Sequence, residues 1–189
     1  PRVNAISFTG SVGTGRGVAA AAVARMAKVQ LEMGGKNPLI VLDDADLPTA
    51  VECAINGAYF STGQRCTASS RLIVTEGIHD KFVSAVRQRL DNLTVDHALK
   101  AGTDIGPVVD QRQLQNNLDY VQVGIQEGAN LVCGGEHVAR DTEGFFMTPA
   151  LFTETTNNMR INREEIFGPV ASVVRVKDYE QALATANDT

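Results

Sequence analysis

Apolar positions along the chain follow two periods, one typical of strands and one typical of helices. Short apolar runs of the length of buried strands lie at 5–8, 39–42, 71–75, 131–133, 145–152 and 170–176. Segments that are rich in alanine, or that carry apolar residues three and four apart, predict helices at 18–30, 47–59, 79–93, 110–127 and 180–187. Strands that alternate with helices in this way predict βα units. The expected fold class is therefore α/β, with a largely parallel sheet flanked by helices.

Residues between these elements support the predicted boundaries. A glycine-rich turn is predicted after the first strand by Gly10, Gly13, Gly15 and Gly17. Asp46 and Asp178 precede two of the predicted helices and are expected to act as N-caps. Gly128 follows another helix and has the position of a C′ glycine.

Composition and charge exclude several classes of protein. The chain has 189 residues, with 17 Lys or Arg and 22 Asp or Glu, so that its net charge is −5, and 43% of it is hydrophobic. This apolar content excludes intrinsic disorder, and the acidic balance argues against a nucleic-acid partner, which calls for a basic surface. The longest run of small apolar residues, 17–24, is interrupted by Arg25 and is shorter than a membrane span. We expect no membrane partner and no signal peptide.

Three cysteines without a paired spacing exclude a disulfide scaffold and fit a reducing, cytoplasmic compartment. Cys53 falls in a predicted apolar helix and Cys133 in a predicted strand, so both are interpreted as buried thiols. Cys66 lies in a polar, glycine-led segment beside Arg65, where a neighbouring cation favours the reactive thiolate. Cys66 is therefore a candidate nucleophile, with an unreactive loop position as the alternative. No metal site is predicted, because the three histidines, His79, His97 and His137, lie far apart in sequence. Each is interpreted as a surface or capping residue.

Three further segments carry candidate chemistry, each with a structural alternative. The stretch at 8–15 has the setting of a nucleotide-binding loop, although a tight βα turn is the commoner explanation. Glu32, followed by two glycines, is a candidate general base or a solvated turn carboxylate. A carboxylate of the pair Glu164–Glu165 is suited to accept from ribose hydroxyls, or the pair is two exposed acids in a capped turn.

Taken together, four stretches resemble the aldehyde dehydrogenase superfamily. They are FTGSVGTG at 8–15, LEMGGKNP at 31–38, GQRCTASSR at 63–71 and EEIFGPV at 164–170. The resemblance covers the whole chain, whereas the chain covers only part of the family. It implies that 1–35 is the C-terminal piece of a cofactor-binding domain and that 36–189 is a truncated catalytic domain.

The resemblance also implies roles for individual residues. Cys66 matches the nucleophile of the family, and Glu32 matches the base that activates the hydrolytic water. The implied cofactor is NAD or NADP, and the residues implied to bind it are Gly10, Ser11, Gly15, Met33, Gly34, Gln113, Glu165 and Phe167. Arg65 is a candidate contact for a substrate carboxylate, with a structural ion pair or a surface cation as alternatives.

The implied reaction is oxidation of a small-molecule aldehyde to a carboxylic acid. It passes through a thiohemiacetal and a thioacyl intermediate on Cys66, and water activated by Glu32 releases the acid. GQRCTASSRLIVTEGIHDKFV, GPVVDQRQL and EEIFGPVASVVRVKDYEQALATANDT most resemble the bacterial dehydrogenases of α-ketoglutaric semialdehyde; succinate semialdehyde is the alternative substrate.

Other parts of the family are expected outside this chain. They include an upstream Asn side chain that donates to the oxyanion, and the residues that separate NAD from NADP. The resemblance also implies a homodimer or homotetramer, formed partly through other segments that are expected outside this chain. We therefore expect the chain alone not to turn over substrate. The alternative to a catalytic segment is that the chain is an inactive folding or interaction module.

Overall fold

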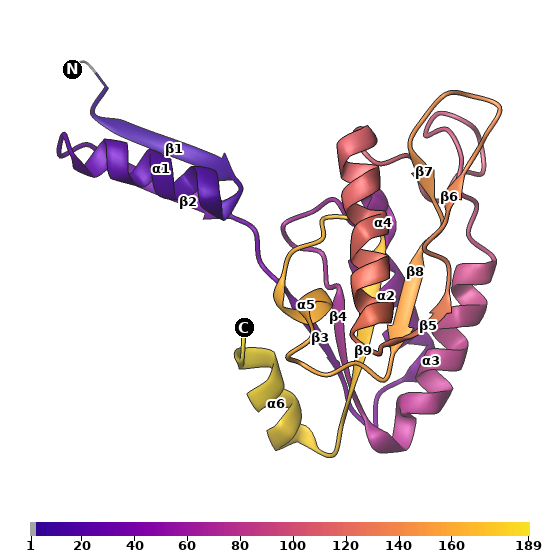
Figure 1. The fold of residues 1–189 in the computed structure, drawn as a ribbon. Helices are drawn as coiled ribbons and strands as arrows, with labels where there is room; N and C mark the ends of the chain where they lie inside the picture. Colours follow the sequence, from indigo (N-terminus) through magenta and orange to yellow (C-terminus); the bar gives the residue numbers. More distant parts are fainter. Residues whose placement is uncertain (1–2) are drawn as a thin grey trace. The chain divides into compact units, whose positions relative to one another are not determined.

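The computed structural model describes residues 3–189, which form two compact units, one that ends at Gly35 and one from Lys36 to Thr189 (Figure 1). The first unit is a βαβ arrangement. Strands β1 (Ala5–Gly10) and β2 (Lys28–Met33) pair in parallel, and α1 (Val12–Val23) connects them.

Two sequence expectations for the first unit are wrong. The helix predicted over 18–30 ends at Val23, and its last part belongs to β2, where Val29, Leu31 and Met33 alternate with polar residues in the period of a strand. The glycine-rich turn predicted over 10–17 is also helical from Val12 onwards, because α1 begins there with Ser11 as its N-cap.

The second unit contains a five-stranded sheet in the order β3-β4-β9-β8-β5. Its strands are β3 (Pro38–Val41), β4 (Arg71–Thr75), β9 (Val170–Val176), β8 (Ala150–Thr153) and β5 (Asn130–Cys133). All neighbours pair in parallel except β5, which runs antiparallel to β8. The predicted α/β class with a largely parallel sheet is confirmed.

Helices cover both faces of this sheet (Figure 1). Helices α2 (Leu47–Ala58) and α3 (Glu76–Asp91) pack on the face that carries Leu72 and Val74. Ile73, which points the other way, packs against α6 (Tyr179–Asn187). Two further helices, α4 (Gln111–Gln126) and the short α5 (Arg160–Arg163), enclose a core with β8 and the start of β9.

Several boundaries and environments differ from the predictions. The run predicted as one strand over 145–152 divides into β7 (Phe146–Met147), which pairs antiparallel with β6 (His137–Val138), and β8. Pro149 lies between them and has no N–H to continue a ladder. His79 is buried rather than at the surface or in a cap, with 2% of it exposed, because it lies on the inner face of α3.

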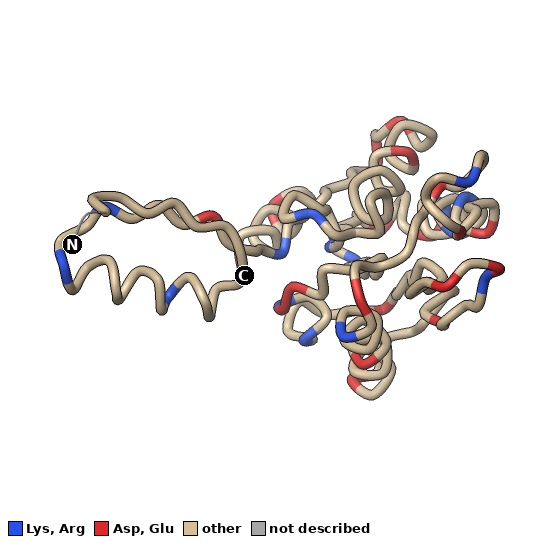
Figure 2. The backbone as a smooth tube through the Cα atoms, turned by 90° about the horizontal axis from the view of Figure 1, so that it is seen from above, with Lys and Arg blue, Asp and Glu red and all other residues tan. Residues whose placement is uncertain are grey.

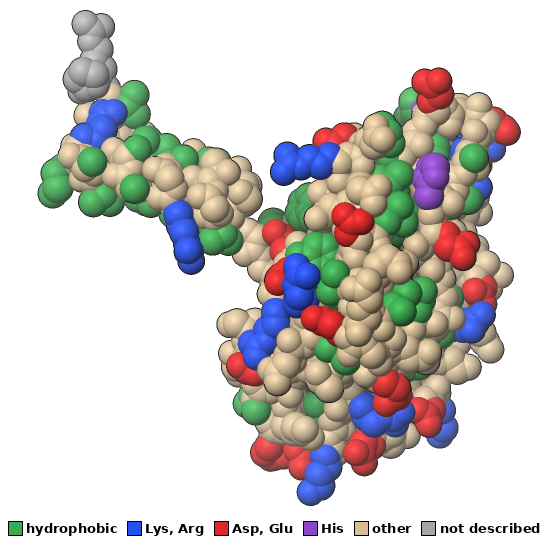
Figure 3. Space-filling view, viewed as in Figure 1, with side chains coloured by type: hydrophobic (Ala, Val, Ile, Leu, Met, Phe, Trp, Pro, Cys, Tyr) green, Lys and Arg blue, Asp and Glu red, His purple; other side chains and the backbone are tan. Residues whose placement is uncertain are grey.

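Cys53 is exposed rather than buried. The inner face of α2 carries Val51, Ala54, Ile55 and Ala58, and Cys53 lies outside that stripe. Basic and acidic side chains are interspersed over the second unit, as Figures 2 and 3 show. Among residues 3–189 no helix is both long and apolar enough to cross a membrane.

A buried arginine joins three segments of the second unit. Arg71, the first residue of β4, is fully buried, and its guanidinium donates to Asn157 Oδ1 at 2.8 Å and to the carbonyls of Thr185 and Ala186 at 2.8 and 2.9 Å. It also donates to the carbonyl of Lys36 at 3.3 Å. Burying a charge is costly unless hydrogen bonds replace its water, and these acceptors supply them to the two terminal nitrogens of the guanidinium.

Lys36 is a second buried cation beside this arginine, with 8% of it exposed. Its pKa is lowered from 10.5 to about 7, first by burial and second by repulsion from Arg71, against an opposing attraction from Glu165 and Glu164. The fold therefore disfavours the charged form of this lysine.

We predict that Lys36→Met stabilises the chain in a pH-dependent way. Below pH 7 Lys36 is protonated in both the folded and the unfolded state, so the full cost of burying its charge is present. Between pH 7 and 10.5 only the unfolded state keeps the proton, so the stability of the wild type rises with pH. The variant should gain roughly 2–5 kcal/mol in the free energy of unfolding at pH 6, and less as the pH rises.

Urea unfolding at pH 6, 8 and 10 checks this prediction. Lys81→Met, which removes an exposed lysine of α3, is the control and should show no pH-dependent gain. A gain for Lys36→Met that stays constant from pH 6 to 10 would contradict the burial of a charge and indicate improved packing alone.

Candidate active site

The candidate residues of the second unit gather at the amino end of its parallel strands. β3, β4 and β9 are neighbours, so the segments that precede them must lie at one edge of the sheet. The contacts agree: the Asn37 side chain donates to the carbonyl of Cys66 at 2.6 Å. A Cβ added to Gly63 would lie 2.2 Å from the carbonyl oxygen of Gly168, so the two loops touch.

The segment that leads to Cys66 has an unusual backbone. Ser61, Thr62 and Gly63, in the short 3-10 turn η1 (Phe60–Gly63), have φ angles of 55°, 57° and 64°. Such left-handed conformations are unfavourable for residues with side chains and persist where the surroundings fix them. Here the Thr62 hydroxyl donates to the carbonyl of Gly106 at 3.2 Å, which holds the turn in place.

Two side chains of the loop that follows, residues 64–70, are bound directly before Cys66. Gln64 Oε1 accepts from the N–H of Val109 at 3.0 Å. Arg65 Nη2 donates to the carbonyl of Gly57 at 3.0 Å and also to that of Asn56, at the end of α2. These contacts favour a structural role for Arg65 over contact with substrate, through helix carbonyls rather than an ion pair.

Cys66 itself is exposed on this anchored loop. Within residues 3–189 its backbone N–H has no hydrogen-bond acceptor, so it remains available to a developing oxyanion. The other two thiols differ: Cys53 is exposed on a regular helix, whereas Cys133 is half-buried and its pKa is raised, mainly by that burial. Cys66 is thus the exposed thiol that lies in an irregular, externally anchored loop.

The two acids of the loop before β9 have different surroundings. Glu164 accepts from Arg160 at 2.9 and 3.0 Å and from the Tyr120 hydroxyl at 2.5 Å. These hydrogen bonds lower the pKa of Glu164, and the bonds from Arg160 have the larger effect. The pKa of Tyr120 is raised to about 12, mainly by burial and secondly by its hydrogen bond to Glu164. Glu165 is exposed and makes no hydrogen bond with the rest of the described chain, so both of its oxygens can accept from a ligand.

Gln113 and Phe167 meet on the same loop. Gln113 Nε2 donates to the carbonyls of Ile166 and Phe167 at 2.8 and 3.1 Å, so its amide nitrogen holds the loop that carries Glu165. Phe167 is 38% exposed and has a φ of 59°, which is rare for a bulky residue. Asn116 also donates to the carbonyl of Ile166, at 3.3 Å.

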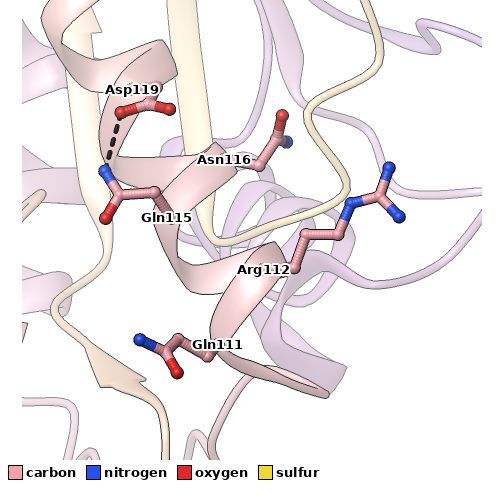
Figure 4. Close-up of a pocket in the computed structure, with 5 residues that line it drawn as sticks. All are labelled: Gln111, Arg112, Gln115, Asn116 and Asp119. Atoms are coloured by element: carbon pink, nitrogen blue, oxygen red, sulfur yellow. Dashed lines mark hydrogen bonds between the residues drawn. The ribbon is translucent and has the colours of Figure 1, made fainter.

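A polar hollow on α4 borders this loop through Asn116 (Figure 4). Its volume is about 610 Å³, and it is lined by Gln111, Arg112, Gln115, Asn116 and Asp119. Gln115 donates to Asp119 at 2.8 Å along the helix, whereas the Arg112 side chain extends away from it (Figure 4). The sequence alone did not indicate this hollow.

The remaining candidates belong to the first unit. Glu32 is exposed on β2 opposite Thr9 of β1, and Gln30 Nε2 lies 3.5 Å from its Oε1. Ser11 caps α1 by accepting from the N–H of Thr14 at 3.3 Å. Gly10 ends β1, and Gly34 follows β2.

Gly15 and Met33 lie against each other in this unit. A Cβ added to Gly15 would be 2.5 Å from Met33 Sδ, so the glycine allows α1 to approach β2. The structure thus gathers Cys66, Gln113, Glu165 and Phe167 in one unit, and the glycine-rich segment with Glu32 and Met33 in the other.

Lys36 and Asn37 are residues of the site that the sequence reasoning did not single out. Both fall within the LEMGGKNP stretch, between a Gly-Gly pair and the start of β3. Two polar side chains directly before a buried strand were the available signal. Their partners, Arg71 and Cys66, are set by strand pairing and not by nearby sequence.

Comparisons with known proteins agree with this description. The aldehyde dehydrogenase family model matches residues 1–189. The chain is 48% identical over 188 residues to the α-ketoglutaric semialdehyde dehydrogenase of Bacillus subtilis, covering 98% of this chain and 38% of that protein. It is 43% identical to human retinaldehyde dehydrogenase 3, covering 100% of this chain and 37% of that protein.

A solved structure is also similar. Betaine aldehyde dehydrogenase from Staphylococcus aureus, in complex with NAD+, matches with a TM-score of 0.96 and 38% identity over 98% of this chain and 37% of that chain. The chain therefore spans less than two fifths of the length of these relatives. A match over all 189 residues shows that the chain belongs to the aldehyde dehydrogenase family.

Proposed function

We propose that this chain is the catalytic segment of a longer NAD(P)-dependent aldehyde dehydrogenase. The observation that carries the proposal is Cys66, an exposed thiol on a loop anchored from several sides, whose own N–H lacks an internal acceptor within the described residues. The proposal includes a cytoplasmic location, taken from the three cysteines without a paired spacing, and a homodimer or homotetramer, taken from the resemblance.

Cys66 would act as the nucleophile. Its thiolate attacks the carbonyl carbon of the aldehyde, a C–S bond forms, and the carbonyl oxygen takes up the negative charge of the thiohemiacetal. The Cys66 N–H is placed to donate to that oxygen. Loss of hydride from the carbon then leaves a thioester on Cys66.

Glu32 would act in the second half of the reaction. Its carboxylate takes a proton from water, and the resulting hydroxide adds to the thioester carbon. The C–S bond breaks, the carboxylic acid leaves, and the thiolate is restored. Glu32 is exposed in this chain, so its carboxylate is accessible to a water molecule.

The residues present fit a nicotinamide dinucleotide. Glu165 offers two unused carboxylate oxygens to a pair of ribose hydroxyls, and Phe167 exposes its ring on the same loop. Ser11 and the first turn of α1 offer a hydroxyl and helix N–H groups suited to a diphosphate. When bound, the cofactor supplies the hydride acceptor.

We predict that Cys66 is the most reactive of the three thiols. In the full-length protein it should react with iodoacetamide at least about tenfold faster than Cys53, although both are exposed, and Cys133 should be slowest because burial raises its pKa. Cys66→Ala should lower kcat by more than about a thousandfold, and Cys53→Ala, the control, should not change it. The assignment fails if Cys66 reacts no faster than Cys53 and Cys66→Ala retains activity.

We predict that Glu32→Gln separates the two halves of the reaction. Without the base, acylation still occurs once per site, so the variant should show a rapid burst of reduced cofactor followed by turnover slower by about a hundredfold or more. Stopped-flow absorbance of reduced cofactor measures both phases. Glu136→Gln, at an exposed glutamate before β6, should behave like the wild type. Unchanged steady turnover in Glu32→Gln would remove Glu32 from the mechanism.

The proposed substrate is α-ketoglutaric semialdehyde, with succinate semialdehyde as the alternative. In its support, the relative of that name is 48% identical, compared with 43% for retinaldehyde dehydrogenase 3 and 38% for betaine aldehyde dehydrogenase.

We predict that kcat/KM of the full-length protein is highest for α-ketoglutaric semialdehyde. It should exceed that for succinate semialdehyde by about tenfold and that for an unbranched apolar aldehyde by about a hundredfold, because an unpaired polar group in the pocket costs more than a missing methylene. The assay is run with NAD and with NADP. Preference for the apolar aldehyde with both cofactors would refute the acidic substrate class.

A further inference from the structure

The Asn37 side chain binds the loop of Cys66 directly. Its Nδ2 donates to the carbonyl of Cys66 at 2.6 Å and to the carbonyl of Ala68 at 3.3 Å. One carboxamide therefore uses its two hydrogens on two carbonyls that flank Thr67. Asn37 lies 29 residues before Cys66, so this contact is tertiary and not part of a local turn.

Asn37 is itself held firmly by β4. The N–H of Arg71 donates to the Asn37 carbonyl at 3.4 Å, and the Arg71 guanidinium donates to the carbonyl of the preceding Lys36 at 3.3 Å. Pro38 follows and begins β3, which pairs with β4 in register from Pro38 and Arg71 onwards. The carboxamide is thus mounted on a backbone that is fixed on both sides.

This geometry decides which polar group of Cys66 faces the reaction. Binding the Cys66 carbonyl fixes the peptide plane between Cys66 and Thr67, and it turns that carbonyl oxygen toward Asn37. A free carbonyl at this position could rotate toward the substrate oxygen and repel its developing negative charge. With the carbonyl held, the unused N–H of Cys66 is the group left to meet the oxyanion.

The loop keeps its shape between the two anchored carbonyls. The N–H of Ala68 donates to the Arg65 carbonyl at 3.0 Å, which closes a turn around Cys66 and Thr67. Asn37 binds this turn at both Cys66 and Ala68, from outside it. Loss of its donors would leave two carbonyls without these partners and allow the turn to change.

We propose that Asn37 is a positioning residue for Cys66. It acts through the carbonyls of the Cys66 loop and touches neither substrate nor cofactor. The inference rests on the proposed role of Cys66 as the nucleophile.

The test uses two replacements of Asn37 and a matched control in the full-length protein. Asn37→Asp keeps the shape but replaces the donor with a carboxylate that repels both carbonyls, whereas Asn37→Ser keeps a donor. Asn92→Asp is the control, because Asn92 Nδ2 likewise donates to a backbone carbonyl, that of Gln88 at 2.8 Å, at the far end of α3. The probe is iodoacetamide, with alkylation of each cysteine followed by peptide mass spectrometry.

The expected result is a selective loss at Cys66. Asn37→Asp should slow alkylation of Cys66 relative to Cys53 by about tenfold and lower kcat by about ten- to a hundredfold, with the Kd for NAD unchanged. Asn37→Ser should fall between Asn37→Asp and the wild type in both measurements, because its hydroxyl has one hydrogen for the two carbonyls. Asn92→Asp should change neither.

The outcomes separate this inference from the function on which it rests. If Cys66 of the wild type reacts no faster than Cys53, the proposed function fails. If Cys66 is fast in the wild type and equally fast in Asn37→Asp, only the positioning role is overturned. Faster alkylation of the half-buried Cys133 in Asn37→Asp would show a general loosening of the fold, and would also overturn it.

Discussion

Parallel pairing of β3, β4 and β9 is the constraint on which the candidate site depends. It places the segments before these strands at a single edge, so that Asn37, Cys66 and Glu165 come from distant parts of the sequence to the same end of the sheet. Open α/β sheets usually bind ligands at the opposite, carboxyl end of their strands. In this chain part of that end is filled: Asp43 Oδ1 accepts from the Thr75 hydroxyl at 2.6 Å and from the N–H of Ile78 at 3.1 Å.

Asp43 thereby occupies the amino terminus of α3, where a bound anion would otherwise lie. A Cβ on Gly77 would come within 2.8 Å of this carboxylate, so the packing there leaves no space. The amino edge has the opposite character. It exposes Cys66 and Glu165, and it also contains two buried basic side chains, Lys36 and Arg71. Their mutual repulsion is one reason why the pKa of Lys36 lies so far below that of a free lysine.

The sequence could predict what local pattern controls. Runs such as 71–75 and 170–176 are apolar enough to be strands in any context, and Asp46 and Asp178 cap the helices expected after them. β2 is not predicted, because the alanine-rich helix before it is expected to continue to residue 30 and so covers the first half of the alternation over 28–33. The motif carrying Cys66 could be recognised from its residues and their resemblance to a family.

The contacts made by that loop could not be predicted in the same way. In the sequence, Arg65 is a cation beside Cys66 and is therefore a candidate for contact with a substrate carboxylate. In the structure it donates instead to carbonyls at the end of α2. Asn37 gave no separate signal, because its role follows from the pairing of β3 with β4 and from the bend before Cys66. Such contacts depend on where distant strands meet, and a single sequence specifies that only through the whole fold.

Backbone strain completes the physical account of the amino edge. Ser61, Thr62 and Phe167 adopt left-handed φ angles although none is glycine, at a cost of about 1–3 kcal/mol each, and all three flank the loops of Cys66 and Glu165. Such conformations survive where hydrogen bonds and packing leave no easier alternative. The Thr62 hydroxyl donates to the carbonyl of Gly106, and the Phe167 carbonyl accepts from Gln113, so two of these three strained residues have a specific restraint. Tertiary contacts therefore hold these loops in conformations that are unfavourable for their residues alone. The proposed reaction at Cys66 requires a site that is preformed in this way.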